Sequence, residues 1–298
     1  KPAPQAPITA LLLGEVAAAT DLPPGALSIV PCGNDQAEQM VRSDVFKMLS
    51  FTGSVPVGWR LKAISGKKKV ALELGGNAGV IIHSDTDLEY AARRCAVGGF
   101  SYSGQTCISV QRIYVQEDAM PAFLDKFIPL VKKLKTGDPA SEKTNVGPLI
   151  DQGALERIEK WVEEAKNTGG EVLTGGSRDG RFFLPTVMTK VTKGMKVCSE
   201  EVFAPLVTVS PYRTFDEAVR EVNESNFGLQ AGIFTNDMKN MFHAFEELEV
   251  GGVMVNEVPT YRIDPMPYGG VKDSGMGREG ARYAIEEMTE PRLLAINP

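Results

Sequence analysis

Residues 45–82 read VFKMLSFTGSVPVGWRLKAISGKKKVALELGGNAGVII, and this stretch decides the fold. The run Val45–Phe51 predicts a strand, Thr52-Gly53-Ser54 opens a helix toward Ile64, and Val70–Leu74 predicts a second strand. Two strands joined by a helix in this way form a βαβ unit, which implies a parallel sheet. The sequence therefore predicts the α/β class.

The alternation of helix and strand extends on both sides of this stretch, and it restarts after Gly75-Gly76. Upstream, the patterns predict a helix over 8–20, a strand over 26–30 and a helix over 35–43. Downstream, they predict strands over 80–82, 111–115, 230–234, 253–256 and 291–296, and helices over 85–100, 120–134, 151–166 and 216–223.

The composition excludes several functional classes. The 298 residues include 32 Lys+Arg against 38 Asp+Glu, and a net charge of −6 leaves no basic surplus for a nucleic-acid backbone. With two histidines, neither a His-rich metal centre nor a His-based serine triad is expected. The four cysteines (Cys32, Cys95, Cys107 and Cys198) are too far apart for a CxxC motif or a disulfide framework, which predicts a reducing, cytoplasmic compartment.

Membrane and secretion signals are also missing from the sequence. No stretch approaches the ~20 unbroken apolar residues of a membrane span, and Gly14 and Glu15 interrupt the longest apolar run, Ala10–Ala19. The first residues, KPAPQ, lack both the features of a signal peptide and an initiator Met. We expect no membrane anchor, and we expect the sequence to be the interior of a longer chain.

The segment 51–58, FTGSVPVG, follows a strand and begins a helix. Free N–H groups and the positive end of the helix dipole can hold an anion such as a pyrophosphate at this junction, so Gly53, Ser54 and Gly58 are candidate cofactor-binding residues. The segment is not the GxGxxG motif, and a capped turn without a ligand is the alternative.

Two residues are candidates for the chemistry itself. Cys107 lies among small residues in SGQTCIS (103–109), where little shields the sulfur, so it suits a nucleophile. The alternative is a buried structural thiol, which is the role that we assign to the other three cysteines. Glu73, in LELGGN (72–77), ends a predicted strand between apolar residues. Partial desolvation would raise the pKa of its carboxyl toward that of a general base, and a satisfied structural carboxylate is the alternative.

These motifs resemble, in order and spacing, those of the NAD(P)-dependent aldehyde dehydrogenases, over the whole chain. The segment 51–58 resembles the cofactor phosphate turn of that family, residues 72–77 its general-base motif, and GQTC (104–107) its nucleophile motif. Further matches are EEVFAP (200–205), NFGLQAG (226–232), PYGGVK (267–272) and Ser274-Gly275.

The resemblance implies a role for each matching residue. Glu201 would bind the hydroxyls of the nicotinamide ribose, Phe203 would pack beside the nicotinamide, and Lys1 would contact the adenosine ribose. Tyr268 would form an aromatic wall of the substrate tunnel, the alternative being an ordinary half-buried tyrosine. Pro4 stands where NAD-preferring members often carry a carboxylate, so both NAD and NADP are expected as cofactors.

The resemblance also implies an architecture. We expect residues 1–75 to be the C-terminal part of a Rossmann-like cofactor domain, 76–275 an α/β catalytic domain, and 276–298 a segment with an oligomerisation strand that serves a homodimer or homotetramer. Ala204 replaces the usual glycine, which mildly restricts that turn. The family's Pro-Trp-Asn segment, which supplies the side-chain donor of the oxyanion hole, would precede Lys1, so the chain is expected to be a fragment.

The activity implied is oxidation of a small aldehyde to a carboxylic acid. Cys107 would form a thiohemiacetal and then a thioester, which water activated by Glu73 would hydrolyse. Transfer of the acyl group to coenzyme A is an alternative that the presence of Glu73 disfavours, and a non-catalytic truncated form is another. Arg262 is a candidate to meet an anionic aldehyde, unless it pairs with Asp264 or a neighbouring subunit. The motifs look most like the lactaldehyde, non-phosphorylating glyceraldehyde-3-phosphate and semialdehyde dehydrogenases.

Overall fold

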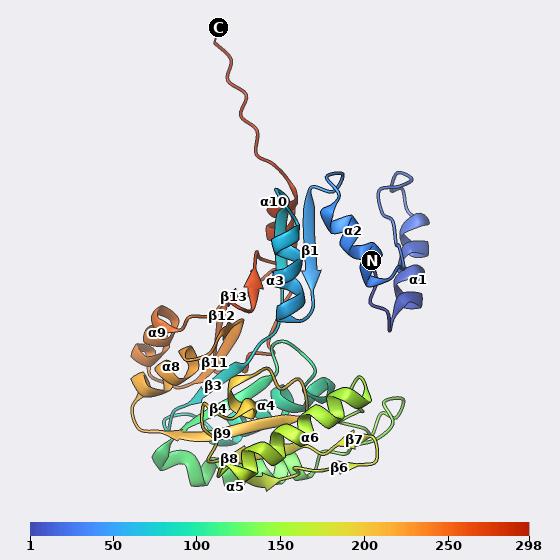
Figure 1. Ribbon diagram of the computed structural model, residues 1–298. Coiled ribbons are helices and arrows are strands. Elements are labelled where there is room, and N and C mark those ends of the chain that lie inside the picture. The colour runs from blue at the N-terminus through green and yellow to red at the C-terminus, as the bar shows by residue number, and fades with distance from the viewer. Residues whose placement is uncertain (298) are drawn as a thin grey trace.

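The structure, a computed structural model, describes residues 1–297 and contains two principal sheets (Figure 1). The seven-stranded sheet has the order β12-β11-β3-β4-β9-β8-β5, and a three-stranded sheet has the order β1-β2-β14. The helices are α1 (Pro7–Ala18), α2 (Asn34–Arg42), α3 (Val55–Ile64), α4 (Leu88–Phe100), α5 (Met120–Lys132), α6 (Gln152–Asn167), α7 (Lys196–Ser199), α8 (Phe215–Asn223), α9 (Met238–Glu247) and α10 (Ala281–Met288).

The strands are β1 (Met48–Thr52), β2 (Lys69–Glu73), β3 (Ala78–Ile82), β4 (Val110–Gln116), β5 (Glu171–Thr174), β6 (Arg178–Asp179), β7 (Phe182–Phe183), β8 (Thr186–Thr189), β9 (Leu206–Tyr212), β10 (Phe227–Gly228), β11 (Gln230–Phe234), β12 (Gly252–Val255), β13 (Val271–Lys272) and β14 (Gly275–Met276). In the large sheet every pairing is parallel except that of the edge strand β5 with β8. This confirms the predicted α/β class.

Helices cover both faces of the large sheet, so its central strands are apolar on both sides. In β3, Val80 and Ile82 pack in one cluster with residues of α4 and α5, whereas Ile81 packs in another with residues of α8 and α9. Side chains alternate between the two faces of a strand, and this places successive residues of β3 in different cores. The result is a rigid platform whose loops carry the motifs described above.

The small sheet brings the C-terminal part of the chain back to the general-base motif. β1 and β2 pair in parallel, with Thr52 opposite Glu73, and β14 pairs antiparallel with β2, with Gly275 opposite Glu73. Leu74 also donates its N–H to the carbonyl of Ser274 at 3.0 Å. Glu73 therefore lies in the central strand of this sheet.

Two predicted strands are absent from the described residues, and several observed elements were not predicted. The strand predicted over 26–30 is wrong: turns and irregular backbone occupy it, and no neighbouring strand among residues 1–297 is there to pair with it. Residues 291–296 form no strand within the chain; they extend away from the body (Figure 1), and residue 298 lies outside the described part. The strands β5–β9 and the helices α9 and α10 were not predicted. No helix among the described residues has the length and apolar character needed to cross a membrane.

Candidate active site

Cys107 lies in a tight loop between α4 and β4. Before it, Tyr102 and Ser103 adopt left-handed backbone angles, with φ of 51° and 59°, and Gly104 follows with φ of 70°. A Cβ atom on Gly104 would lie 2.1 Å from the carbonyl oxygen of Ala204, so only glycine lets these two loops meet. The local sequence thus places the cysteine against the loop that carries Glu201 and Phe203.

The sulfur of Cys107 lies 3.1 Å from the hydroxyl oxygen of Tyr268. Burial raises the pKa of the Cys107 thiol, the Tyr268 hydroxyl opposes that rise, and the negative charge of Glu73 adds to it. Burial also raises the pKa of Tyr268 above its usual range, so its hydroxyl keeps its proton. Tyr268 is therefore a donor that can stabilise a Cys107 thiolate.

Glu73 ends β2 with 8% of its surface exposed, and its Oε2 atom is buried without a hydrogen-bond partner in the described structure. Burial, with a smaller contribution from the charge of Glu279, raises the pKa of Glu73 to about 8, and Arg262 and Arg278 oppose this. These residues line a cavity of about 360 Å³ with Glu73. A carboxyl in this state is a suitable general base near neutral pH.

The double glycine allows the Cys107 loop and Glu201 to approach the end of β2. A Cβ atom on Gly76 would lie 1.9 Å from the Cys107 carbonyl oxygen, and the Gly76 N–H donates to Glu201 Oε1 at 2.8 Å. Burial raises the pKa of Glu201, and the bond from Gly76 partly offsets that rise. Cys107, Glu73 and Glu201 thus surround one glycine pair.

Two buried amides hold the loop of Glu201 and Phe203. The Asn77 side chain donates to the carbonyls of Cys198 and Glu200, both at 2.9 Å. Gln111 donates to the Glu200 carbonyl at 2.7 Å and accepts from the Val202 N–H at 3.0 Å. Phe203, at the turn of this loop, has φ of 48° and is 37% exposed.

The predicted phosphate turn lies at the N-terminus of α3. Ser54 is the N-cap residue, but its side chain makes no capping hydrogen bond, so N–H groups of the first turn remain for a ligand. A neighbouring cavity of about 690 Å³ is lined by Thr52 and Val57 and by three cations and one carboxylate, namely Lys1, Arg60, Lys68 and Glu38. A dinucleotide with its pyrophosphate on this helix fits both the size and the charge of this region.

Arg262 pairs with Glu279 rather than with Asp264. Its guanidinium lies 2.8 Å from Glu279 Oε2 and stacks on the ring of Tyr268, 4.0 Å from the ring centroid. Tyr268 therefore contacts the sulfur of Cys107 through its hydroxyl and Arg262 through its ring face.

The structure thus groups Cys107, Glu73, Tyr268, Arg262 and Glu201, with Phe203 on the adjoining loop. Lys1 lines the cavity beside α3, Gly53 precedes the N-cap residue Ser54, and Gly58 lies in the first turn of α3. The profile of the aldehyde dehydrogenase family matches residues 1–294. The chain belongs to the aldehyde dehydrogenase family.

Individual aldehyde dehydrogenases are similar over nearly the whole chain. The 3-sulfolactaldehyde dehydrogenase of Priestia aryabhattai is 46% identical over 298 residues, which is 100% of this chain and 62% of that protein. The crystal structure of aldehyde dehydrogenase 21 from Physcomitrella patens, in complex with the reaction product succinate, superposes with a TM-score of 0.95 at 47% identity, covering 97% of this chain and 61% of that one.

A second aldehyde dehydrogenase of known structure is the glyceraldehyde-3-phosphate dehydrogenase GapN from Methanocaldococcus jannaschii, complexed with NADP. It superposes with a TM-score of 0.92 at 38% identity, covering 96% of this chain and 64% of that one. The chain therefore spans about 60% of the length of the relatives it matches.

Several residues of the site were missed by sequence reasoning. Arg278 and Glu279 lie in the segment 276–298, for which the sequence predicts an oligomerisation strand; the pairing of β14 with β2 and the bridge between Tyr268 and Glu279 return them to the site. Gln111 lies inside a buried strand, where a single amide gives no signal of a loop 90 residues away in the sequence.

Proposed function

We propose that this chain carries the catalytic machinery of an NAD(P)-dependent aldehyde dehydrogenase that oxidises an aldehyde to a carboxylic acid. The observation that carries the proposal is a cysteine sulfur that a tyrosine hydroxyl contacts at 3.1 Å and that lies within electrostatic reach of a buried glutamate, whose Oε2 atom has no hydrogen-bond partner among the described residues. Family membership supports the reaction type. A nucleophile beside a desolvated base suits acyl transfer to water.

The chemistry divides into two stages. The Cys107 thiolate adds to the carbonyl carbon of the aldehyde, and the Cys107 N–H and the Tyr268 hydroxyl are the nearby donors. A bound NAD or NADP would accept the hydride from that carbon. Glu73 then removes a proton from water, which attacks the resulting thioester; the carbon–sulfur bond breaks, and the acid and Cys107 are released.

The cofactor residues keep the roles expected from the sequence. The α3 N-terminus, with Gly53 and Ser54 before it and Gly58 in it, would bind the pyrophosphate. Lys1 lines the cavity for the adenosine side. Glu201, fixed by the Gly76 N–H at 2.8 Å, and Phe203 would hold the nicotinamide end beside Cys107.

We also propose that the substrate is a short aldehyde with an acidic group. Arg262 stacks on the ring of Tyr268, and the hydroxyl of Tyr268 contacts the Cys107 sulfur. In a short aldehyde whose carbonyl is bound at that sulfur, an acidic group only a few bonds from the carbonyl would reach the Arg262 guanidinium. Both 3-sulfolactaldehyde, named for one relative, and succinate, the product bound by another, are acidic.

We retain residues 1–75, 76–275 and 276–298 as proposed units, and a homodimer or homotetramer as the proposed assembly. The exposed side chains of Leu293, Leu294 and Ile296 support an intersubunit role for the last segment. Light scattering of the complete protein, with and without residues after Thr289, tests this: a monomer in both cases would refute it.

The central experiment uses the complete natural protein with succinic semialdehyde and each cofactor. Cys107→Ala should abolish turnover, whereas Glu73→Gln should give one burst of reduced cofactor and then a slow steady state, because acylation precedes the step that needs the base. Arg262→Leu should raise KM for succinic semialdehyde about 100-fold and leave KM for propanal within about threefold. Turnover by Cys107→Ala would refute the mechanism, and equal effects on both aldehydes would refute the role of Arg262.

A further inference from the structure

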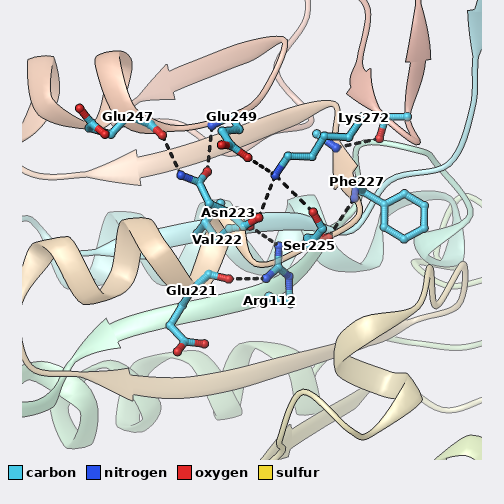
Figure 2. A network of polar contacts seen from close by, with 11 residues as sticks. Arg112, Glu221, Val222, Asn223, Ser225, Phe227, Glu247, Glu249 and Lys272 are labelled. Atoms are coloured by element: carbon cyan, nitrogen blue, oxygen red, sulfur yellow. Dashed lines mark hydrogen bonds and ion pairs between the residues drawn. The ribbon is translucent and has the colours of Figure 1, made fainter.

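The C-terminal end of α8 is held by two cations from distant parts of the chain (Figure 2). Arg112 donates to the carbonyls of Glu221 and Val222 at 2.8 and 3.1 Å. Lys272 donates to the carbonyls of Asn223 and Ser225 at 2.8 and 3.3 Å. The last carbonyls of a helix lack partners within the helix, and its C-terminal end attracts positive charge, so both cations lie where the helix favours them.

Lys272 also forms an ion pair with Glu249, 2.6 Å from Oε2. The Asn223 side chain holds the backbone on either side of Leu248. It accepts a hydrogen bond from the Glu249 N–H at 2.8 Å and donates one to the Glu247 carbonyl at 2.7 Å. Figure 2 shows the Lys272 ammonium lying among these groups. The ammonium therefore joins three segments: the end of α8, the turn after α9, and the segment that contains Lys272 itself.

This last segment runs between the two catalytic candidates. At one end, the Tyr268 hydroxyl lies 3.1 Å from the Cys107 sulfur. At the other end, Gly275 pairs with Glu73. Lys272 lies between them with φ of 53°, a backbone angle that favours glycine. Contacts that Lys272 makes elsewhere, including those of its ammonium, therefore offset the cost of this backbone conformation.

We propose that Lys272 is a positioning residue, whose ammonium fixes the segment 268–275 on the C-terminal end of α8 and thereby holds the Tyr268 hydroxyl on the Cys107 sulfur. The proposal rests on the proposed function, because it assigns Tyr268 to a catalytic thiol. Removing the ammonium should loosen the segment without detaching it, since Asp273 still donates its N–H to the Asn226 carbonyl at 2.9 Å and Ser274 Oγ still accepts from the Gly228 N–H at 3.0 Å.

The test measures the alkylation of Cys107 by iodoacetamide against pH, with peptide mass spectrometry to separate Cys107 from the other cysteines. The rate follows the thiolate fraction and needs neither aldehyde nor cofactor, so failure of the proposed dehydrogenase activity would not alter this readout. Tyr268→Phe sets the reference: loss of the hydroxyl should shift the alkylation profile to higher pH and slow the reaction at about pH 8 by roughly tenfold.

Lys272→Met should shift the profile in the same direction, with alkylation slowed about fivefold, and Lys272→Arg should restore it to within about twofold. In the double variant Lys272→Met/Tyr268→Phe, Cys107 should be alkylated no more slowly than in Tyr268→Phe alone, because both substitutions act on the same contact between the Tyr268 hydroxyl and the Cys107 sulfur. The matched control is Lys190→Met, since Lys190 also has a positive φ, of 54°, and an ion pair at 2.6 Å, with Glu171. It should leave the profile unchanged.

An unchanged profile in folded Lys272→Met, or additive effects in the double variant, would overturn the proposal. If Lys272→Met does not fold, Glu249→Gln gives the same readout, because it removes the counter-ion and leaves the carbonyl bonds of the lysine in place. It should slow alkylation about twofold, and an unchanged rate there also overturns the proposal.

Discussion

Replacing Glu73 with glutamine should alter how the stability of the protein depends on pH. Folding raises the pKa of this carboxyl from 4.5 to about 8, chiefly through burial. Between those two pH values the folded chain keeps a proton that the unfolded chain has released. The free energy of unfolding of the parent protein must therefore fall as the pH rises through this window.

The magnitude follows from the size of the pKa change. A tenfold change in an acid constant corresponds to about 1.4 kcal/mol. Raising the pKa from 4.5 to about 8, with some screening by solvent, therefore removes roughly 3–5 kcal/mol of stability above the upper value. Glutamine has a similar shape and does not titrate here, so the stability of Glu73→Gln relative to the parent should grow by that amount between about pH 4 and about pH 9.

Urea unfolding, followed by the fluorescence of Trp59 and Trp161, measures this difference at a series of pH values. Glu246→Gln is the matched control, because Glu246 is exposed and makes no ion pair within the described residues. Its stability should stay parallel to that of the parent throughout. If the Glu73→Gln curve also stays parallel, within about 1 kcal/mol, then the carboxyl is not desolvated and our assignment of the general base loses its physical basis.

Three further changes test the surroundings of the site. Glu279→Gln removes a negative charge that raises the pKa of Glu73, so the alkaline rise in turnover should move to lower pH and the rate at about pH 7 should roughly double. Gly76→Ala places a Cβ atom 1.9 Å from the Cys107 carbonyl oxygen. We therefore expect the free energy of unfolding, measured by thermal unfolding, to fall by at least about 2 kcal/mol, and Cys107 to be alkylated more slowly. Gln111→Leu leaves the Val202 N–H without its 3.0 Å partner, so stability should fall by about 2 kcal/mol and KM for the cofactor should rise about tenfold, while alkylation of Cys107 stays unchanged.

In the large sheet, the strands β3, β4, β11 and β12 were predictable from the sequence, and β5, β8 and β9 were not. The predicted strand over 230–234 coincides with β11, which is buried throughout and mostly apolar. The predicted strand over 111–115 lies within β4, where Ile113, Tyr114 and Val115 favour a strand. β9 escaped prediction because Pro211 and the polar Thr208 and Ser210 interrupt its apolar run. The strand predicted over 26–30 shows the opposite error, since an apolar run becomes a strand only where another strand pairs with it.

The site shows a similar limit. Cys107, Glu73 and Tyr268 belong to short motifs, and the structure places them together. The roles of Arg112 and Lys272 were not predictable, because both bind backbone carbonyls, which every residue offers and no sequence pattern marks. Arg262 was recognised, but its partner Glu279 was not, because that pairing depends on how the chain returns after β14.

Cys107 and Glu73 both hold their protons more tightly in the folded protein, and this shared property constrains the order of events at the site. Burial is the main cause for each, and the charge of Glu73 further raises the pKa of Cys107. A charge on either group thus disfavours a charge on the other, so near neutral pH this pair favours at most one negative charge. In the mechanism that we propose, a sulfur bound in a thioester can no longer carry that charge, and the carboxyl of Glu73 would then be easier to ionise. A larger fraction of Glu73 is therefore in the ionised form that accepts a proton at the stage at which, in the proposed mechanism, water is activated.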